Sequence, residues 1–290
     1  MEITLDQTAA SCVLDLMDFG HERHSEVGAT EHPAVLAYEH LFFARFDSAL
    51  AAAKTLDSHS RYESGVRSQI EALCAGSVTS APNSAIVSEH GPALDTATAM
   101  RVFHSSEAAH VIGDIELCTT LTSRALARGV DNPRAETWLR FGLVRSLLFQ
   151  GQVRQAAGVL AESEATTPLA IESQKCLKAL VSGLSGERST VVELAESLSR
   201  RMVAPSTYAD AGLALIGAFG LAASGLPQNA SELLRYGGGG PGLPLLPLAL
   251  RAYGYDMLVE AAIAAGNADL AAWMMLDFDR IDLGTNRQML

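Results

Sequence analysis

The amino-acid sequence predicts an all-α protein, a superhelical solenoid of about seven helical hairpins. Alanine and leucine are abundant, and both are among the strongest helix formers. Hydrophobic residues make up 48% of the chain and aromatic residues only 6%, so the apolar material consists of small and aliphatic side chains that let helices approach closely. A glycine followed five positions later by a small residue recurs along the chain, as is typical of stacked helical repeats.

This recurring pattern predicts seven turns between helices. Successive turns are 32 to 41 residues apart, at Ala44, Gly76, Gly113, Gly151, Gly186, Gly225 and Gly266. We expect the turn residue to adopt the left-handed conformation that ends one helix. The small residue five positions later, alanine in most cases, then lets the next helix pack close to the first. Polar residues at Asp114, Gln152 and Asn267 start three of these second helices.

The whole chain, residues 1–290, is predicted to be a single helical-repeat domain with an irregular front part. Residues 1–95 are acidic and contain most of the histidines, whereas residues 96–290 follow the repeat more regularly. The stretch Gly237–Gly242 interrupts the helical pattern, and whether it is a hinge stays open. Its glycines do not form a phosphate-binding loop, because no Lys-Ser or Lys-Thr pair follows and no strand precedes.

Charge and hydropathy limit the classes of partner. The formal net charge is −12 and the pI is near 5.1, so the chain should repel nucleic-acid backbones and anionic membranes. No segment approaches the length of apolar sequence that spans a membrane, and the N-terminus lacks the basic region of a signal peptide. We therefore expect a cytoplasmic protein.

The sequence predicts a chain that is not an enzyme and needs no cofactor or metal. No Gly-x-Ser-x-Gly motif is present, and the four cysteines are far apart, which indicates reduced core side chains. His21 and His24 share a spacing that a metal site can use. No third ligand is specified, however, so we favour a histidine pair that complements a helix end.

The turn sequences resemble those of the tetratricopeptide family. Ala44-Arg45-Phe46-Asp47-Ser48-Ala49-Leu50 and Gly266-Asn267-Ala268-Asp269-Leu270-Ala271 are similar to that family's turn between helices, and Pro168 falls where its second helix ends. The resemblance implies a concave groove lined by the first helices, at positions 13, 10, 6 and 3 residues before each turn residue. The groove residues that it nominates are Tyr38, Met100, Phe103, Glu107, His110, Trp138, Phe141, Arg145, Leu148, Phe219, Tyr253, Asp256, Glu260 and Ile263.

These groove positions have two interpretations. An aromatic wall with a few charged groups is typical of ligand pockets and peptide grooves. Trp138 and Phe141 are equally explained by packing between neighbouring repeats, because aromatic side chains favour both environments.

A narrower resemblance covers residues 250–273, from Leu250-Arg251-Ala252-Tyr253-Gly254-Tyr255-Asp256 to Gly266-Asn267-Ala268-Asp269-Leu270-Ala271-Ala272-Trp273. This stretch is similar to the repeat region of large LuxR-type, MalT-like transcriptional regulators. In that family an ATPase precedes a helical sensor region and a helix-turn-helix follows it. The resemblance implies a regulatory module that binds a small-molecule effector or a partner segment in its groove.

The alternative function is a stand-alone scaffold that recognises a peptide or a helix of another protein. Whether the natural gene continues past Leu290 or begins upstream of Met1 would discriminate the two. The last residues show no hydrophilic capping helix, which indicates truncation or an interface, for which a second copy of the chain is one candidate. The acidic front segment with its Met1 indicates instead a natural start.

Overall fold

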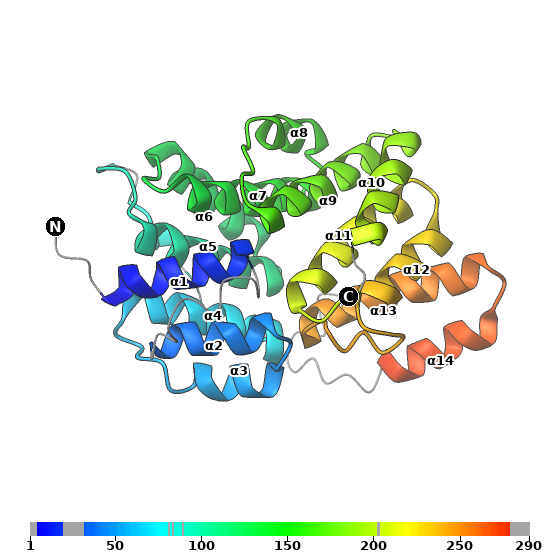
Figure 1. Cartoon of the computed structure of the whole chain (residues 1–290), viewed down its shortest axis with the longest axis horizontal. Helices are drawn as coiled ribbons and strands as arrows, with labels where there is room; N and C mark the ends of the chain where they lie inside the picture. The colour runs from blue at the N-terminus through cyan, green and yellow to red at the C-terminus, as the bar shows by residue number, and fades with distance from the viewer. Residues whose placement is uncertain are drawn as a thin grey trace. The chain divides into compact units, whose positions relative to one another are not determined.

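The computed structural model describes residues 5–19, 32–80, 82, 84–88, 90–201 and 204–278 (Figure 1). These residues form α-helices and contain no β-strand, which confirms the predicted all-α class. The first eight helices are α1 (Leu5–Phe19), α2 (Pro33–Phe42), α3 (Phe46–Ala53), α4 (Arg61–Ala75), α5 (Thr96–Val111), α6 (Ile115–Arg128), α7 (Pro133–Phe149) and α8 (Val153–Ala161). The last six are α9 (Pro168–Leu184), α10 (Arg188–Arg201), α11 (Tyr208–Ala223), α12 (Pro227–Gly237), α13 (Leu248–Ala264) and α14 (Ala268–Phe278).

The chain divides into two compact units, with the boundary between Ile171 and Glu172. Unit 1 contains α1 to α8 and the first turn of α9, and unit 2 contains the rest of α9 and the helices up to α14. This boundary has no counterpart in the sequence pattern, since α9 continues across it. The single repeat domain stays a prediction.

All seven predicted turn residues adopt the left-handed conformation. Their φ angles are 53° at Ala44, 64° at Gly76, 85° at Gly113, 73° at Gly151, 83° at Gly186, 73° at Gly225 and 71° at Gly266. Because an L-residue with a Cβ atom is strained at such angles, glycine is the preferred residue at six of them. This part of the sequence prediction is confirmed.

The small residue five positions after the turn is buried in each described case. Its side chain is at most 5% exposed at Ala49, Cys118, Ala156, Val191, Ala230 and Ala271, whereas Ala81 lies outside the described residues. A larger side chain there would hold the two helices of the hairpin apart. Asp114 and Asn267 cap their helices as predicted, accepting from Leu117 N and Leu270 N at 3.0 and 3.1 Å, but Gln152 makes no such bond.

Six of the seven turns join two helices, and the turn at Gly76 does not. The first helices are α2, α5, α7, α9, α11 and α13, and the second helices are α3, α6, α8, α10, α12 and α14. After Gly76 the described chain contains only a single 3₁₀ turn at Ser84–Ile86 before α5 begins. Pro82 follows the expected small residue, and proline disfavours a helix at the residue before it. The described residues therefore contain six of the about seven predicted hairpins.

Helices that are adjacent in sequence pack against each other within each unit. In unit 1, α3 packs on α4 and α6 on α7, and in unit 2 α12 packs on α13. First helices also contact one another, as α5 does with α7 and α11 with α13. Such neighbour contacts are typical of helical repeats. The superhelical, tetratricopeptide-like arrangement itself stays a prediction.

Glycines bring two first helices of unit 2 into backbone contact. A Cβ atom placed on Gly220 of α11 would lie 2.8 Å from the carbonyl carbon and oxygen of Ala179 of α9. A Cβ atom on Gly183 of α9 would likewise meet the backbone of Gly220. Because backbone atoms cannot move aside as a side chain does, only glycine fits this crossing.

We expect Gly220→Ala to lower the free energy of unfolding by roughly 1–3 kcal/mol, since the added methyl group forces α9 and α11 apart. Gly212→Ala in the same helix is the matched control, because its Cβ would meet nothing within 4 Å. That control should stabilise the chain by about 0.5–1 kcal/mol through helix propensity. Urea unfolding of both variants checks the prediction, and equal stabilities would contradict it.

Candidate functional site

Four aromatic side chains of the predicted groove are buried in unit 1. The Phe103 ring on α5 lies 6.2 Å from Trp138 on α7, and Trp138 lies 5.6 Å from Phe141, centroid to centroid. Tyr38 on α2 contacts the His104 ring at 5.5 Å. All four side chains have less than a tenth of their surface exposed. The His104 ring also lies 5.5 Å from that of Phe103, so the four side chains and His104 form one continuous aromatic ladder.

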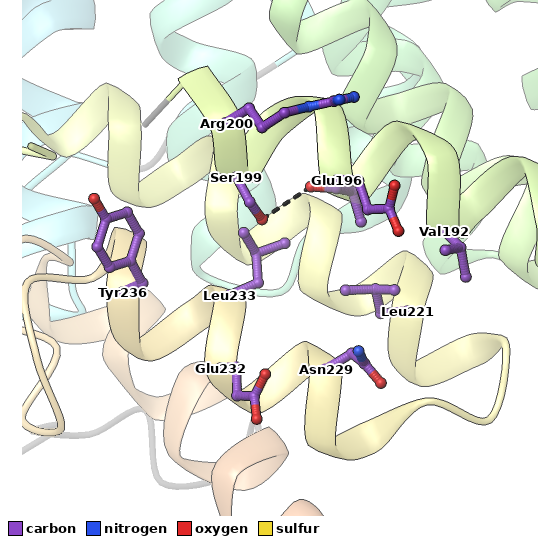
Figure 2. Close-up of a pocket in the computed structure, with 10 residues that line it drawn as sticks. Val192, Glu196, Ser199, Arg200, Leu221, Asn229, Glu232, Leu233 and Tyr236 are labelled. Carbon is purple, nitrogen blue, oxygen red and sulfur yellow. Dashed lines mark hydrogen bonds between the residues drawn. The ribbon is translucent and has the colours of Figure 1, made fainter. Parts of the chain in front are cut away.

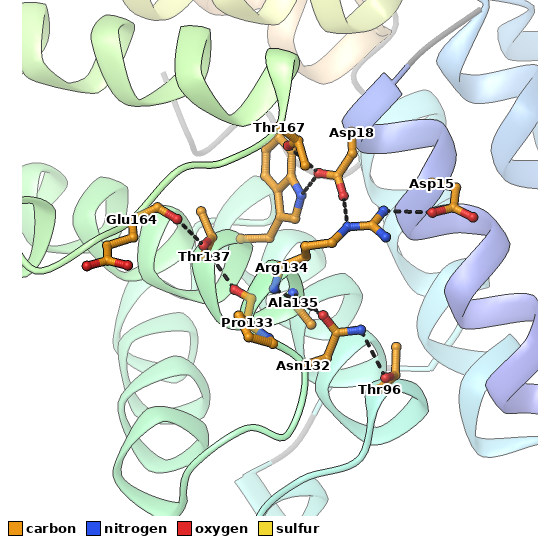
Figure 3. A network of polar contacts seen from close by, with 11 residues as sticks. Asp15, Asp18, Thr96, Asn132, Pro133, Arg134, Ala135, Thr137, Glu164 and Thr167 are labelled. Carbon is orange, nitrogen blue, oxygen red and sulfur yellow. Dashed lines mark hydrogen bonds and ion pairs between the residues drawn. The ribbon is translucent and has the colours of Figure 1, made fainter. Parts of the chain in front are cut away.

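Helix α1 is anchored to this ladder by the carboxylate of Asp18 (Figure 3). Asp18 Oδ1 accepts from Trp138 Nε1 at 3.0 Å and from Thr167 Oγ1 at 2.9 Å, and its Oδ2 pairs with Arg134 Nε. Arg134 also donates to Asp15 at 2.8 Å. Only 1% of Asp18 is exposed. A fully buried carboxylate therefore holds α1 to α7, and α1 also packs on α2, α4 and α5.

Burial and neighbouring charges shift the pKa of Arg134 in opposite directions. Burial alone would lower the pKa of its guanidinium, but the hydrogen bonds and charges of Asp15 and Asp18 outweigh that effect and raise it. The two aspartates therefore stabilise the charged form of Arg134.

The charged residues of the predicted groove in unit 1 pair with each other. Glu107 of α5 forms an ion pair with Arg145 of α7, and Glu107 is buried. His110 lies one turn further along α5, with its ring 4.7 Å from that of Phe149. Burial, and to a lesser degree the charge of Arg145, lowers the pKa of His110 to about 3. The imidazole is therefore neutral at physiological pH.

The predicted groove residues of unit 2 are more exposed. Phe219 on α11 and Tyr253 on α13 are half-buried, and Asp256 and Glu260 on α13 are exposed. Burial raises the pKa of the Tyr253 phenol.

A pocket of about 570 Å³ lies in unit 2 among α10, α11 and α12 (Figure 2). Its lining residues are Val192, Ala195, Glu196, Ser199 and Arg200 of α10, Leu221 of α11, and Asn229, Glu232, Leu233 and Tyr236 of α12. None of them is among the residues that the sequence nominated. The predicted groove uses first helices, whereas this pocket is walled mainly by two second helices.

The pocket combines an apolar floor with a polar rim. Ala195, Leu221 and Leu233 are buried, and the side chains of the rim are exposed. Glu196 and Glu232 face the opening from opposite walls (Figure 2) and form no ion pair with a described residue. Ser199 Oγ donates to the backbone oxygen of Ala195 at 3.0 Å. The arrangement suits a ligand that has an apolar body and a positively charged group.

Two further observations concern metals and membranes. In the described part of the chain, no three His, Cys, Asp or Glu side chains are placed to hold a metal ion, and the pair His21 and His24 lies outside that part. All four cysteines are free thiols. No described helix has both the length and the apolar character that crossing a membrane requires.

Comparison of the chain with known protein families, with curated proteins and with solved structures finds no match. The function is therefore inferred from the residues and their geometry.

Proposed function

We propose that this chain is a non-enzymatic regulatory module that binds an effector in the pocket among α10, α11 and α12. The pocket itself carries the proposal: its volume of about 570 Å³ falls in the range of small-molecule sites, and its floor is apolar. Polar groups on the rim would fix the orientation of a ligand. The pocket offers no nucleophile paired with a base among its lining residues, so binding fits it better than chemistry.

The charges of the rim favour a small amphipathic cation as the effector. Glu196 and Glu232 supply two carboxylates against the single guanidinium of Arg200, and Tyr236 adds an exposed aromatic ring at one end. An aromatic ring beside carboxylates attracts an amine or a quaternary ammonium group. An aliphatic body of the ligand would cover Leu221 and Leu233.

The regulatory part of the proposal is supported by the resemblance of residues 250–273 to LuxR-type regulators. In a sensor region, the bound effector would bias domains that lie outside this chain. Binding between two second helices is suited to this role, because a ligand that contacts both α10 and α12 favours one packing of their hairpins over others.

We expect a thermal-shift screen of metabolites to find amphipathic amines that raise the melting temperature. At a ligand concentration one hundred times Kd, the added stability is about 2.7 kcal/mol. The double variant Glu196→Gln/Glu232→Gln should weaken binding of such a hit at least about tenfold, because it removes both charge-assisted contacts.

Glu193→Gln is the control for this experiment, since Glu193 is exposed on α10 but does not line the pocket. Its affinity for the hit should equal that of the wild type. If the double variant binds as well as the wild type while Tyr253→Ala loses binding, the effector site is instead the first-helix face that the sequence nominated.

A further inference from the structure

Helix α1 precedes the hairpins of unit 1 and belongs to none of them. The first hairpin is formed by α2 and α3 around the turn residue Ala44. Among the described helices, the main packing contacts of α1 are with α2, α4 and α5. Asp18 adds a contact with α7, because it accepts a hydrogen bond from Trp138. Since a single helix contacts all four, they present one common side to it, which we call the first-helix face. Each of the four is followed by a turn residue, namely Ala44, Gly76, Gly113 and Gly151.

The first-helix face includes a position that the sequence nominated for ligand binding. Trp138 lies 13 residues before Gly151, and its indole N–H donates to Asp18 of α1 (Figure 3). With α1 in place, only 9% of Trp138 is exposed. The nominated position is therefore occupied by a helix of the chain itself.

Mostly small apolar side chains pack α1 against this face. The five that lie along one side of the helix are at most 4% exposed, namely Ala9, Ala10, Val13, Leu14 and Met17. Residues three and four apart lie on the same side of a helix, so these five form one stripe. Thr8 and Ser11 on the opposite side are exposed. Helix α1 is therefore amphipathic, and its alanines let it approach the helices of the face closely.

The carboxylate of Asp18 decides which helix fits this face. It lies at the edge of the apolar stripe, where it accepts from Trp138 and Thr167 and pairs with Arg134. A helix without a carboxylate here would leave these donors unpaired, which is strongly unfavourable. The ion pair itself adds little net affinity, because removing both charges from water offsets their attraction. The carboxylate therefore contributes specificity for a helix with an acidic residue at this position.

The first-helix face also contains a hydroxyl group that α1 does not satisfy. Only 1% of Tyr62 on α4 is exposed, and its hydroxyl has no hydrogen-bond partner among the described residues. Burial, and after it the neighbouring Asp6 and Cys12 of α1, raises the pKa of this phenol, so the hydroxyl lies near α1. A buried hydroxyl without a partner destabilises the packing around it. A helix with a hydrogen-bond acceptor near the position of Cys12 would avoid this cost.

We propose that the first-helix face of unit 1 is a docking surface for an amphipathic helix of a partner protein, and that α1 occupies this face until the partner displaces it. The partner helix would share the pattern of α1, with small residues at the positions of Ala9 and Ala10 and an aspartate at that of Asp18. An acceptor at the position of Cys12 would give it the hydrogen bond to Tyr62 that α1 lacks.

A second copy of the chain is a poorer occupant than a partner protein. Its α1 would make the same contacts as the chain's own α1 and would leave the Tyr62 hydroxyl equally unsatisfied. The chain's own α1 also has a high effective concentration at the face, because it is covalently attached. Only a helix that makes an additional contact can displace it.

The test uses the full chain and a labelled synthetic peptide with the sequence of residues 5–19, whose Kd is measured by fluorescence anisotropy. In the chain variant Asp18→Asn, the chain's own α1 loses its buried carboxylate. The fraction of chains with an open first-helix face then rises, and the apparent affinity for the peptide rises with it. We expect the peptide to bind this variant at least about tenfold more tightly than it binds the wild-type chain.

Two altered peptides and one control variant test the recognition itself. On the Asp18→Asn chain, a peptide with Asp18→Asn should bind at least about tenfold more weakly than the unaltered peptide, since it lacks the carboxylate. A peptide with Cys12→Asn should bind at least about threefold more tightly, because it gains a hydrogen bond to Tyr62. Asp47→Asn in the chain is the control, because it removes an exposed aspartate of α3. That variant should bind the unaltered peptide as weakly as the wild-type chain does.

Hydrogen exchange of the wild-type chain tests displacement without any substitution. The protection factors of the α1 amides should be at least about tenfold lower than those of the α5 and α7 amides, because α1 must open while the helices of the face stay folded. This measurement keeps the proposal testable if Asp18→Asn prevents folding, which circular dichroism would show.

Three results would overturn the proposal. These are α1 amides protected as strongly as those of α5 and α7, no peptide binding to a folded Asp18→Asn chain, and equal binding of the peptides with and without Asp18. A Cys12→Asn peptide that binds no more tightly would overturn the acceptor in the partner's pattern. A wild-type chain that sediments as a dimer through exchanged α1 helices would assign the face to a second copy. None of these results bears on the pocket among α10, α11 and α12, because the first-helix face shares no residue with it.

Discussion

Replacing Asp18 by alanine should lower the free energy of unfolding by roughly 3–5 kcal/mol, the cost of removing one partner from a buried ion pair. The variant would leave the Arg134 guanidinium without its buried partner, and the Trp138 indole N–H without its acceptor. The Thr167 hydroxyl would also lose its acceptor. Each buried donor left unsatisfied adds its own penalty of about 1–3 kcal/mol, although such penalties do not add fully.

Asp15→Asn is the matched control, because Asp15 pairs with the same Arg134 from a position on α1 that is only half-buried. An ion pair that water still reaches contributes about 0–1 kcal/mol, so this variant should lose much less stability than Asp18→Ala. Urea unfolding measures both stabilities, and hydrogen exchange of the α1 amides shows whether α1 opens first. If Asp18→Ala costs no more than Asp15→Asn, the buried network does not hold α1 in place.

The turns of the fold were predictable because their causes are local. A left-handed glycine and a small residue five positions later specify a hairpin without reference to the rest of the chain, and Gly151 with Ala156 is a clear case. The pattern fails at Gly76 because a turn residue ends a helix whether or not another one follows. Pro82, which is not part of the turn pattern, is the signal against a second helix there.

The buried network was not predictable, because its partners are far apart in sequence. Trp138 is 120 residues from Asp18, and Thr167 is 149 residues from it. The sequence therefore left Trp138 equally consistent with a groove and with a packed core. Nothing in the pattern of α1 marks Asp18 as an aspartate that the fold buries.

The pocket among α10, α11 and α12 was not predictable from the sequence, for a different reason. Its walls are formed by faces of α10 and α12. These faces carry polar residues such as Glu196 and Glu232, which in a sequence are typical of ordinary solvent-exposed helix surface. Tyr236 is the one signal that the sequence offers, since it is a scarce aromatic residue at the end of a helix beside the glycine-rich loop. Whether such a residue lines a pocket depends on how the two hairpins are spaced, which local sequence does not specify.

Lowering the pH from 7 to 5 should destabilise the chain by roughly 2–4 kcal/mol through two histidines, the fully buried His104 and the half-buried His110. Burial lowers the pKa of His104 to about 3, and burial together with the charge of Arg145 lowers the pKa of His110 to about 3. His104 Nδ1 lies 2.6 Å from Gln69 Oε1, and its Nε2 has no hydrogen-bond partner. The fold therefore keeps this imidazole neutral.

The sign of the effect follows from the unfolded chain, in which a histidine has a pKa near 6.5. Between about pH 6.5 and 3 the unfolded state binds protons that the folded state excludes. Above pH 6.5 the neutral histidines cost the folded state no stability, because the unfolded chain is also unprotonated there. As the pH falls below 6.5, the free energy of unfolding decreases by about 1.4 kcal/mol per pH unit for each fully buried histidine. We expect His104 to contribute more than His110, because no part of it is exposed.

Urea unfolding at several pH values between 5 and 7.5 measures this loss. His104→Gln should reduce the slope of stability against pH by about half or more, because glutamine does not titrate. His59→Gln, which removes an exposed histidine, is the control. A slope that is the same in wild type and His104→Gln would show that His104 is protonated within the fold, contrary to its burial among the rings of Tyr38, Tyr62 and Phe103.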